Sequence, residues 1–160
     1  MKIQDILRQC YDVAKRSPDK SNQNGAALVS PIRYDLILLG WNRFPIGFDV
    51  DVNDRSEKLF YIEHAERDVL FRAAKSGIST VGRVLVCPWA ACGDCARAII
   101  FSGIQRLIVH KQRMEMTPDR WKANVEKAGR YMIDCGVEIE YFDGKVGGGP
   151  ILVNGELWYP

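Results

Sequence analysis

Hydrophobic residues recur every three or four positions along several stretches of the chain, which is the period of a helix with one buried face. Ala65, Val69 and Ala73 form such a stripe, and Gly77 follows it as a stop signal. The same period predicts helices at 2–16, 64–77 and 117–136, and a short helix at 94–103 is expected to stop at Gly103. Thr117, Pro118 and Asp119 mark the start of the last helix, with the Thr117 hydroxyl expected to cap it.

Short apolar or alternating runs between these helices predict strands at 25–30, 34–40, 83–87, 106–110 and 137–142. Near the C-terminus, ILVNGELW predicts a hairpin that turns at Asn154 and Gly155, since both residue types tolerate positive φ. Residues 40–62 show no clear period, and a loop of that length is usually functional or mobile. Because strands alternate with helices, we expect an α/β layered fold with part of its sheet parallel.

Composition narrows the class of protein. With 47% hydrophobic residues, the 160-residue chain suits one domain with a sizeable core, so we expect a single domain over 1–160. The net charge of +2 is weak evidence against a polynucleotide partner, and no apolar run is long enough to span a membrane. Five cysteines, an odd number, and an N-terminus unlike a signal peptide favour a reducing, cytoplasmic location.

The starts of two neighbouring helices carry residues that suit a catalytic zinc site. His64 and Glu66 open one helix, and Cys92 and Cys95 open the next after an intervening strand. One histidine and two cysteines are ligands that zinc prefers, and three protein ligands leave one position for water. Because two thiolates cancel the charge of Zn²⁺, a base beside that water becomes useful, and Glu66 is placed for this role.

Each motif alone has a simpler explanation. A histidine at a helix start is often a cap or a surface residue. A Cys-x-x-Cys pair in a reduced protein could be a redox pair, a partial zinc knuckle or two core thiols. The combination of the two motifs is harder to explain separately, so we favour the catalytic zinc site.

At these residues the sequence resembles the zinc-dependent cytidine and deoxycytidylate deaminase superfamily, whose signature is His-x-Glu followed by Pro-Cys-x-x-Cys. The resemblance extends to SPDKSNQNGA at 17–26, GWNRFPIG at 40–47 and CARAIIFSGIQRLIV at 95–109, and it covers about residues 15–110. It implies a three-layer α/β/α sandwich around a mixed five-stranded sheet. It also implies that His64, Cys92 and Cys95 hold zinc, while Glu66 moves a proton from water to N3 of cytosine and then to the leaving ammonia.

The resemblance suggests substrate contacts as well. The expected residues are Asn42, Lys20, Ser21, Asn22, Ala65 and Trp89. Asn42 matches an asparagine that contacts the substrate, and Trp89 either walls the base pocket or packs on the sheet. Lys20, Ser21 and Asn22 offer one cation and short hydrogen-bond donors to a phosphate, although the same residue types are common in polar turns.

The resemblance implies hydrolytic deamination of dCMP to dUMP, which supplies pyrimidine nucleotide for dTMP synthesis. Ala91 stands where the family usually has proline, and Asp68 stands where it often has asparagine, which leaves the accepted base or nucleotide open. The alternatives are deamination of guanine, a tRNA base or a modified cytosine nucleotide, a non-catalytic zinc-binding subunit, and a thiol redox protein. Since relatives are commonly homo-oligomers and some respond to dCTP and dTTP, self-association and these effectors are further expectations.

Overall fold

The computed structural model describes residues 1–160 and contains one five-stranded sheet in the order β2-β1-β3-β4-β5. The strands are β1 (Gly25–Val29), β2 (Leu36–Trp41), β3 (Val84–Val86), β4 (Arg106–His110) and β5 (Glu138–Phe142). β1 pairs antiparallel with β2 and β3, whereas β3, β4 and β5 are parallel to one another. The sheet is therefore mixed, as expected.

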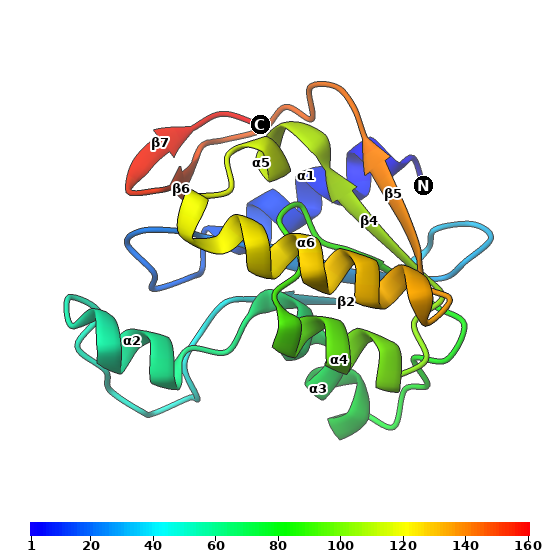
Figure 1. Ribbon diagram of the computed structural model, residues 1–160, viewed down its shortest axis with the longest axis horizontal. Helices are drawn as coiled ribbons and strands as arrows, with labels where there is room; N and C mark the ends of the chain where they lie inside the picture. The colour runs from blue at the N-terminus through cyan, green and yellow to red at the C-terminus, as the bar shows by residue number, and fades with distance from the viewer.

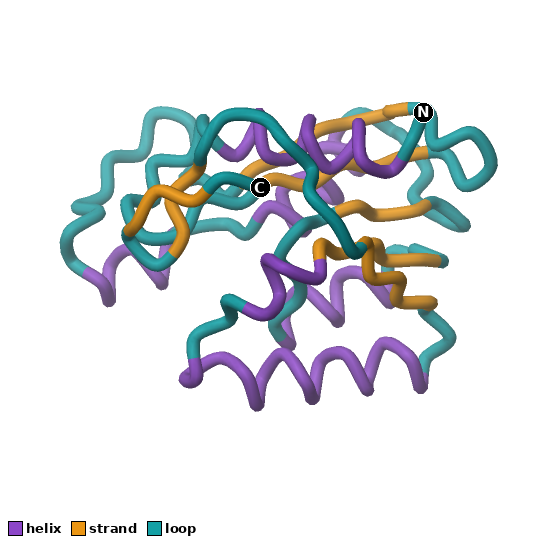
Figure 2. Tube along the Cα trace, turned by 90° about the horizontal axis from the view of Figure 1, so that it is seen from above, coloured by secondary structure: helices purple, strands orange, loops and turns teal.

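Helices cover both faces of this sheet (Figures 1 and 2). The helices are α1 (Ile3–Ala14), α2 (Arg55–Tyr61), α3 (Ala65–Lys75), α4 (Gly93–Phe101), α5 (Lys111–Glu115) and α6 (Asp119–Asp134). α1 packs on one face, while α3, α4 and α6 pack on the other, which gives the three layers. None of the helices combines the length and the apolar composition that crossing a membrane requires.

The alternation of side chains along the central strands separates two hydrophobic cores. On β4, Leu107 and Val109 face the core under α3, α4 and α6, whereas Ile108 faces the core under α1. On β1, Leu28 and Ala27 divide between the two cores in the same way. Because these strands are covered on both sides, their sequences are almost continuously apolar, which explains why they were recognisable.

The C-terminal hairpin forms as predicted, from β6 (Ile151–Val153) and β7 (Glu156–Trp158). Asn154 and Gly155 occupy the turn with φ of 53° and 85°, a region that glycine and asparagine adopt most readily. Ile151 and Val153 join the core under α1, so the hairpin belongs to that layer of the fold.

Three local predictions differ from the structure. The stretch 40–62 contains the short helix α2, whose N-cap Asp54 accepts hydrogen bonds from the Ser56 and Glu57 backbone N–H groups. α2 is only 7 residues long and mostly exposed, so it has no hydrophobic period to detect. α5 was missed because its 5 residues are too few to show a helical period. The cap prediction for α6 was wrong: Pro118 is the N-cap residue, and the Thr117 hydroxyl donates instead to the Met114 carbonyl at 2.6 Å.

Candidate active site

The predicted zinc ligands meet where two helices begin on the same side of the sheet. His64 is the N-cap residue of α3, Cys92 is the N-cap residue of α4, and Cys95 lies in the first turn of α4. Nδ1 of His64 lies 3.6 Å from Sγ of Cys92 and 3.5 Å from Sγ of Cys95. All three ligand atoms lie within 4.8 Å of one another.

This donor set fits zinc. A tetrahedral ion with Zn–S and Zn–N bonds of about 2.3 and 2.05 Å would hold nitrogen and sulfur about 3.6 Å apart. The two nitrogen–sulfur distances agree with that value, so the ligands need little movement to bind the ion. His64, Cys92 and Cys95 supply three protein ligands, which would leave the fourth coordination position of zinc for a water or a substrate atom.

Of the two cysteines, Cys92 favours the thiolate form that metals need. A hydrogen bond from Cys95 lowers the pKa of the Cys92 thiol to about 3, and the neighbouring His64 ring lowers it further. The same hydrogen bond raises the pKa of Cys95, since the pair shares one proton. Arg67 of α3 lies close by, where it pairs with Glu63 and approaches Asp94 of α4 at 3.5 Å. Arg67 therefore connects the two helix starts and adds positive charge beside the thiolates.

Glu66 lies in the first turn of α3 and lines the same cavity as His64 and Cys92. Only 2% of its surface is exposed. Burial raises the pKa of the Glu66 carboxyl to about 7, against the opposing effect of His64. A carboxyl group with such a pKa exchanges protons readily near neutral pH, which is the property that acid–base catalysis requires.

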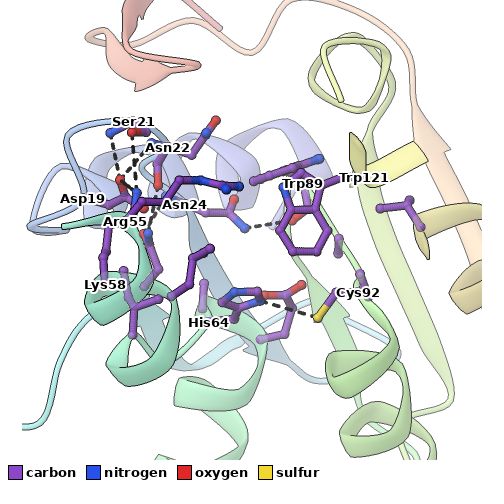
Figure 3. A pocket seen from close by; sticks show the side chains of 18 of the residues that line it. Asp19, Ser21, Asn22, Asn24, Arg55, Lys58, His64, Trp89, Cys92 and Trp121 are labelled. Carbon is purple, nitrogen blue, oxygen red and sulfur yellow. Dashed lines mark hydrogen bonds and ion pairs between the residues drawn. The ribbon is translucent and has the colours of Figure 1, made fainter. Parts of the chain in front are cut away.

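The cavity has a volume of about 190 Å³ and continues from the ligands toward the segment that precedes β1 (Figure 3). In this view His64 and Cys92 lie at one end, whereas Asp19, Ser21 and Asn22 lie at the other. Residues of the 40–62 stretch form a further wall, and they are Asn42, Val52, Asn53, Arg55, Lys58, Leu59 and Ile62. Trp89, Trp121 and Val125 supply an aromatic and apolar wall.

The side chain of Asn42 fixes the polar end of the cavity. Its Oδ1 accepts from the backbone N–H of Asn24 at 2.8 Å, and its Nδ2 donates to the Asn22 carbonyl at 2.8 Å. Asn24 in turn donates from Nδ2 to the Trp89 carbonyl at 2.8 Å. Asn42, directly after β2, therefore aligns the 22–24 segment, and Asn24 of that segment holds the loop that carries Trp89.

The structure brings most of the predicted substrate contacts together. Ser21, Asn22, Asn42, Ala65 and Trp89 all line the cavity with Glu66. Lys20 does not line it, which corrects the sequence prediction.

The Lys20 side chain is exposed, and its ammonium donates at 3.3 Å to Oδ1 of Asn53, a residue of the cavity wall. Lys58 of α2 occupies the cavity wall instead, with Nζ 3.0 Å from Asp19. The two lysines are close together in the fold but 38 positions apart in sequence, and no local pattern distinguishes which of them faces the cavity.

Sequence reasoning also missed two arginines at the cavity. Arg55, at the start of α2, and Arg120, in the first turn of α6, both line it. Both side chains are exposed, and neither guanidinium group forms a hydrogen bond or an ion pair within the protein. Together with Lys58 they make this cavity a place where an anion would be attracted.

Of the two residues that depart from the family signature, Ala91 lines the cavity and Asp68 does not. Ala91 is buried and lines the cavity beside Cys92. Asp68 is not a cavity residue. Its carboxylate accepts a hydrogen bond from the Trp41 backbone N–H and forms ion pairs with Arg43 and Arg72. Asp68 therefore connects α3 to the end of β2 and to the start of the 40–62 stretch.

A His-x-Glu helix start facing a Cys-x-x-Cys helix start, above a mixed sheet, defines the class of this protein as a zinc-binding deaminase domain. The chain belongs to the family described as the cytidine and deoxycytidylate deaminase zinc-binding region, whose model matches residues 1–111. This confirms the family and the cofactor predicted from sequence, with His64, Cys92 and Cys95 as the candidate zinc site.

One related sequence and two solved structures show which deaminases this chain is similar to. A probable deoxycytidylate deaminase of Drosophila melanogaster is 27% identical over 141 residues, which cover 80% of this chain and 64% of that protein. The dCMP deaminase of cyanophage S-TIM5, crystallised with dCMP and dUMP, is 25% identical with a TM-score of 0.70, over 89% of this chain and 99% of that one. A guanine deaminase of Nitrosomonas europaea shares the fold alone, with 16% identity and a TM-score of 0.51, over 86% of this chain and 75% of that one. The cytidine deaminase-like fold prediction is therefore confirmed.

Proposed function

We propose that this protein catalyses the hydrolytic deamination of dCMP to dUMP, acting as a single deaminase unit over residues 1–160. One observation carries the proposal: a single cavity joins a zinc site and a buried carboxylate at one end to a polar, cation-lined pocket at the other. The relatives that act on or bind dCMP by their names support the choice of nucleotide.

At the metal end, zinc held by His64, Cys92 and Cys95 would act as a Lewis acid that makes a water more acidic. Glu66 would accept one proton of that water and deliver it to N3 of the cytosine, and it would then carry the second proton, from the hydroxyl group formed at C4, to the departing amino group. Ala65, which lies between His64 and Glu66 in the sequence, has a small side chain that leaves room for the planar cytosine ring. Trp89 and Trp121 flank the cavity and exclude water from this ring.

At the polar end, the cavity offers hydrogen-bond donors and positive charge to a phosphate. Ser21 and Asn22 line it beside the Lys58 ammonium, and the guanidinium groups of Arg55 and Arg120, which have no ion-pair partner, belong to the same cavity. A nucleoside without phosphate would leave these groups unused, whereas a monophosphate would satisfy them. This supports a nucleotide over a free nucleoside as the substrate.

The test is ammonia release from a panel of cytosine, adenine and guanine bases, nucleosides and monophosphates. We expect dCMP to give the highest kcat/KM. A preference for deoxycytidine over dCMP would refute the nucleotide assignment, and a preference for guanine or an adenine compound would refute the base assignment. Self-association, dCTP or dTTP effects and a cytoplasmic location stay predictions, to be measured separately.

The role of Glu66 has its own test. Replacing it by glutamine in Glu66→Gln keeps the side-chain shape but removes the group that carries the proton. We expect zinc content to stay unchanged and kcat to fall about 10²- to 10⁴-fold, as for other acid–base groups. A Glu66→Gln protein within a few-fold of the parent rate would show that the proton moves by another route.

A further inference from the structure

Arg113 of α5 is an unusual residue beneath the cavity. Its surface is 0% exposed, and it is not one of the cavity-lining residues. Nη2 donates to Oδ1 of Asn22 at 3.0 Å, and the guanidinium carbon lies 4.3 Å from the centre of the Trp89 ring. Its Nε and Nη1 atoms are buried without a hydrogen-bond partner. A buried cation with so few partners costs stability, which makes a functional role the better explanation.

The contact with Asn22 determines what that residue can offer to a ligand. Oδ1 of Asn22 accepts a second hydrogen bond, at 3.1 Å, from the backbone N–H of Asn154 in the hairpin turn. Two donors therefore occupy both lone pairs of Oδ1 and fix the orientation of the amide. No residue accepts a hydrogen bond from Nδ2 of Asn22, although Asn22 lines the cavity. Asn22 is thus held with its oxygen turned inward and its N–H groups available.

The same guanidinium supports the aromatic wall. The Trp89 ring rests against Arg113 on one side, and its Nε1 donates to the Thr117 hydroxyl at 2.9 Å. Asn22 lies at the end of the cavity remote from His64 and Cys92 (Figure 3). Its available donors therefore face the part of the substrate that is farthest from the reacting base.

We propose that Arg113 is a positioning residue that holds Asn22 as an obligate hydrogen-bond donor to a phosphate oxygen of the substrate. This inference rests on the proposed function, because it assumes a nucleotide monophosphate in the cavity. It also gives the C-terminal hairpin, which lies beyond the family-matched residues 1–111, a part in the site through the Asn154 backbone.

Two substitutions test the proposal with dCMP as the substrate. Arg113→Met keeps much of the side-chain volume and removes the donor, while the Asn154 N–H still holds the amide in part. We expect KM to rise about tenfold with kcat within threefold of the parent, and Arg113→Lys to recover part of this loss. Asn22→Asp keeps the pairing with Arg113 but turns an acceptor oxygen toward the phosphate, so we expect KM to rise about 100-fold.

The controls separate positioning from general damage. Arg130→Met, on the exposed side of α6, should leave KM unchanged, and every variant should retain the zinc content of the parent. If Arg113 had only a structural role, Arg113→Met would lower the unfolding temperature and kcat without a selective rise in KM.

If the parent does not deaminate dCMP, the proposed function fails, and the inference fails with it. If the parent is active and Asn22→Asp has a parental KM, the inference alone is overturned. Should Arg113→Met not fold, Asn22→Asp decides the question, since its side chain is only half-buried and stays paired.

Discussion

Replacing Lys58 by methionine should separate its contribution to folding from its contribution to substrate binding. The Lys58 and Asp19 side chains are 10% and 9% exposed, and their charged atoms lie 3.0 Å apart. Removing one partner of a buried pair typically costs about 3–5 kcal/mol, because the other charge is left buried. Asp19 would still accept hydrogen bonds from the Ser21 and Asn22 backbone N–H groups, at 2.7 and 3.3 Å.

These two remaining donors place the expected loss for Lys58→Met near the lower limit, at about 3 kcal/mol. For a chain of this size, that loss lowers Tm by about 6–12 °C. Adding Asp19→Asn removes the stranded charge, so the double variant Lys58→Met/Asp19→Asn should regain most of the lost stability. It should not regain dCMP turnover, because the cavity still lacks the ammonium that would face the phosphate.

The assays are thermal unfolding and kcat/KM for dCMP on the parent, both single variants and the double variant. Lys20→Met is the matched control, since the Lys20 side chain is exposed and lies outside the cavity. We expect it to change stability by less than about 0.5 kcal/mol and to leave turnover unchanged. The reasoning is refuted if Lys20→Met costs more than Lys58→Met, or if the double variant recovers turnover together with stability.

Two further predictions concern zinc and pH. Elemental analysis should find one zinc per chain in the parent but not in Cys92→Ser. Cys135→Ser, which removes an exposed thiol, is the control and should keep its zinc. Full zinc retention by both Cys92→Ser and Cys95→Ser would exclude the assigned ligands. His110 accepts a hydrogen bond from the Tyr11 hydroxyl at 2.6 Å and donates one to the Gly144 carbonyl at 2.8 Å. Burial lowers the pKa of His110. The neutral ring therefore contributes its full stability above about pH 6.5, the pKa in the unfolded chain, and this contribution is lost as the pH falls. Between pH 7.5 and 5.5 this contribution amounts to at most about 1.4 kcal/mol, and urea unfolding should show a smaller pH dependence in His110→Gln than in the parent; equal dependence would exclude His110 as the cause.

The sequence alone determined the elements with strong hydrophobic patterns and the chemistry of the metal ligands. The buried strands were recognisable because both of their faces are covered, and the Asn154-Gly155 turn was recognisable because few residue pairs tolerate its backbone angles. His64, Cys92 and Cys95 were recognisable because a metal restricts both residue type and spacing near helix starts. Helices α2 and α5 escaped detection, since helices of 7 and 5 residues are too short to show a repeated apolar face.

Tertiary structure alone decided which polar residues face the cavity. Lys20 and Lys58 are chemically alike, and only the packing of α2 against the segment before β1 places Lys58 inside and Lys20 outside. Arg113 carried no local signal, because its partners Asn22 and Trp89 lie 91 and 24 positions away in the chain. Side-chain orientation in a cavity depends on contacts between distant segments, whereas a strand or a metal-ligand motif is encoded by near neighbours.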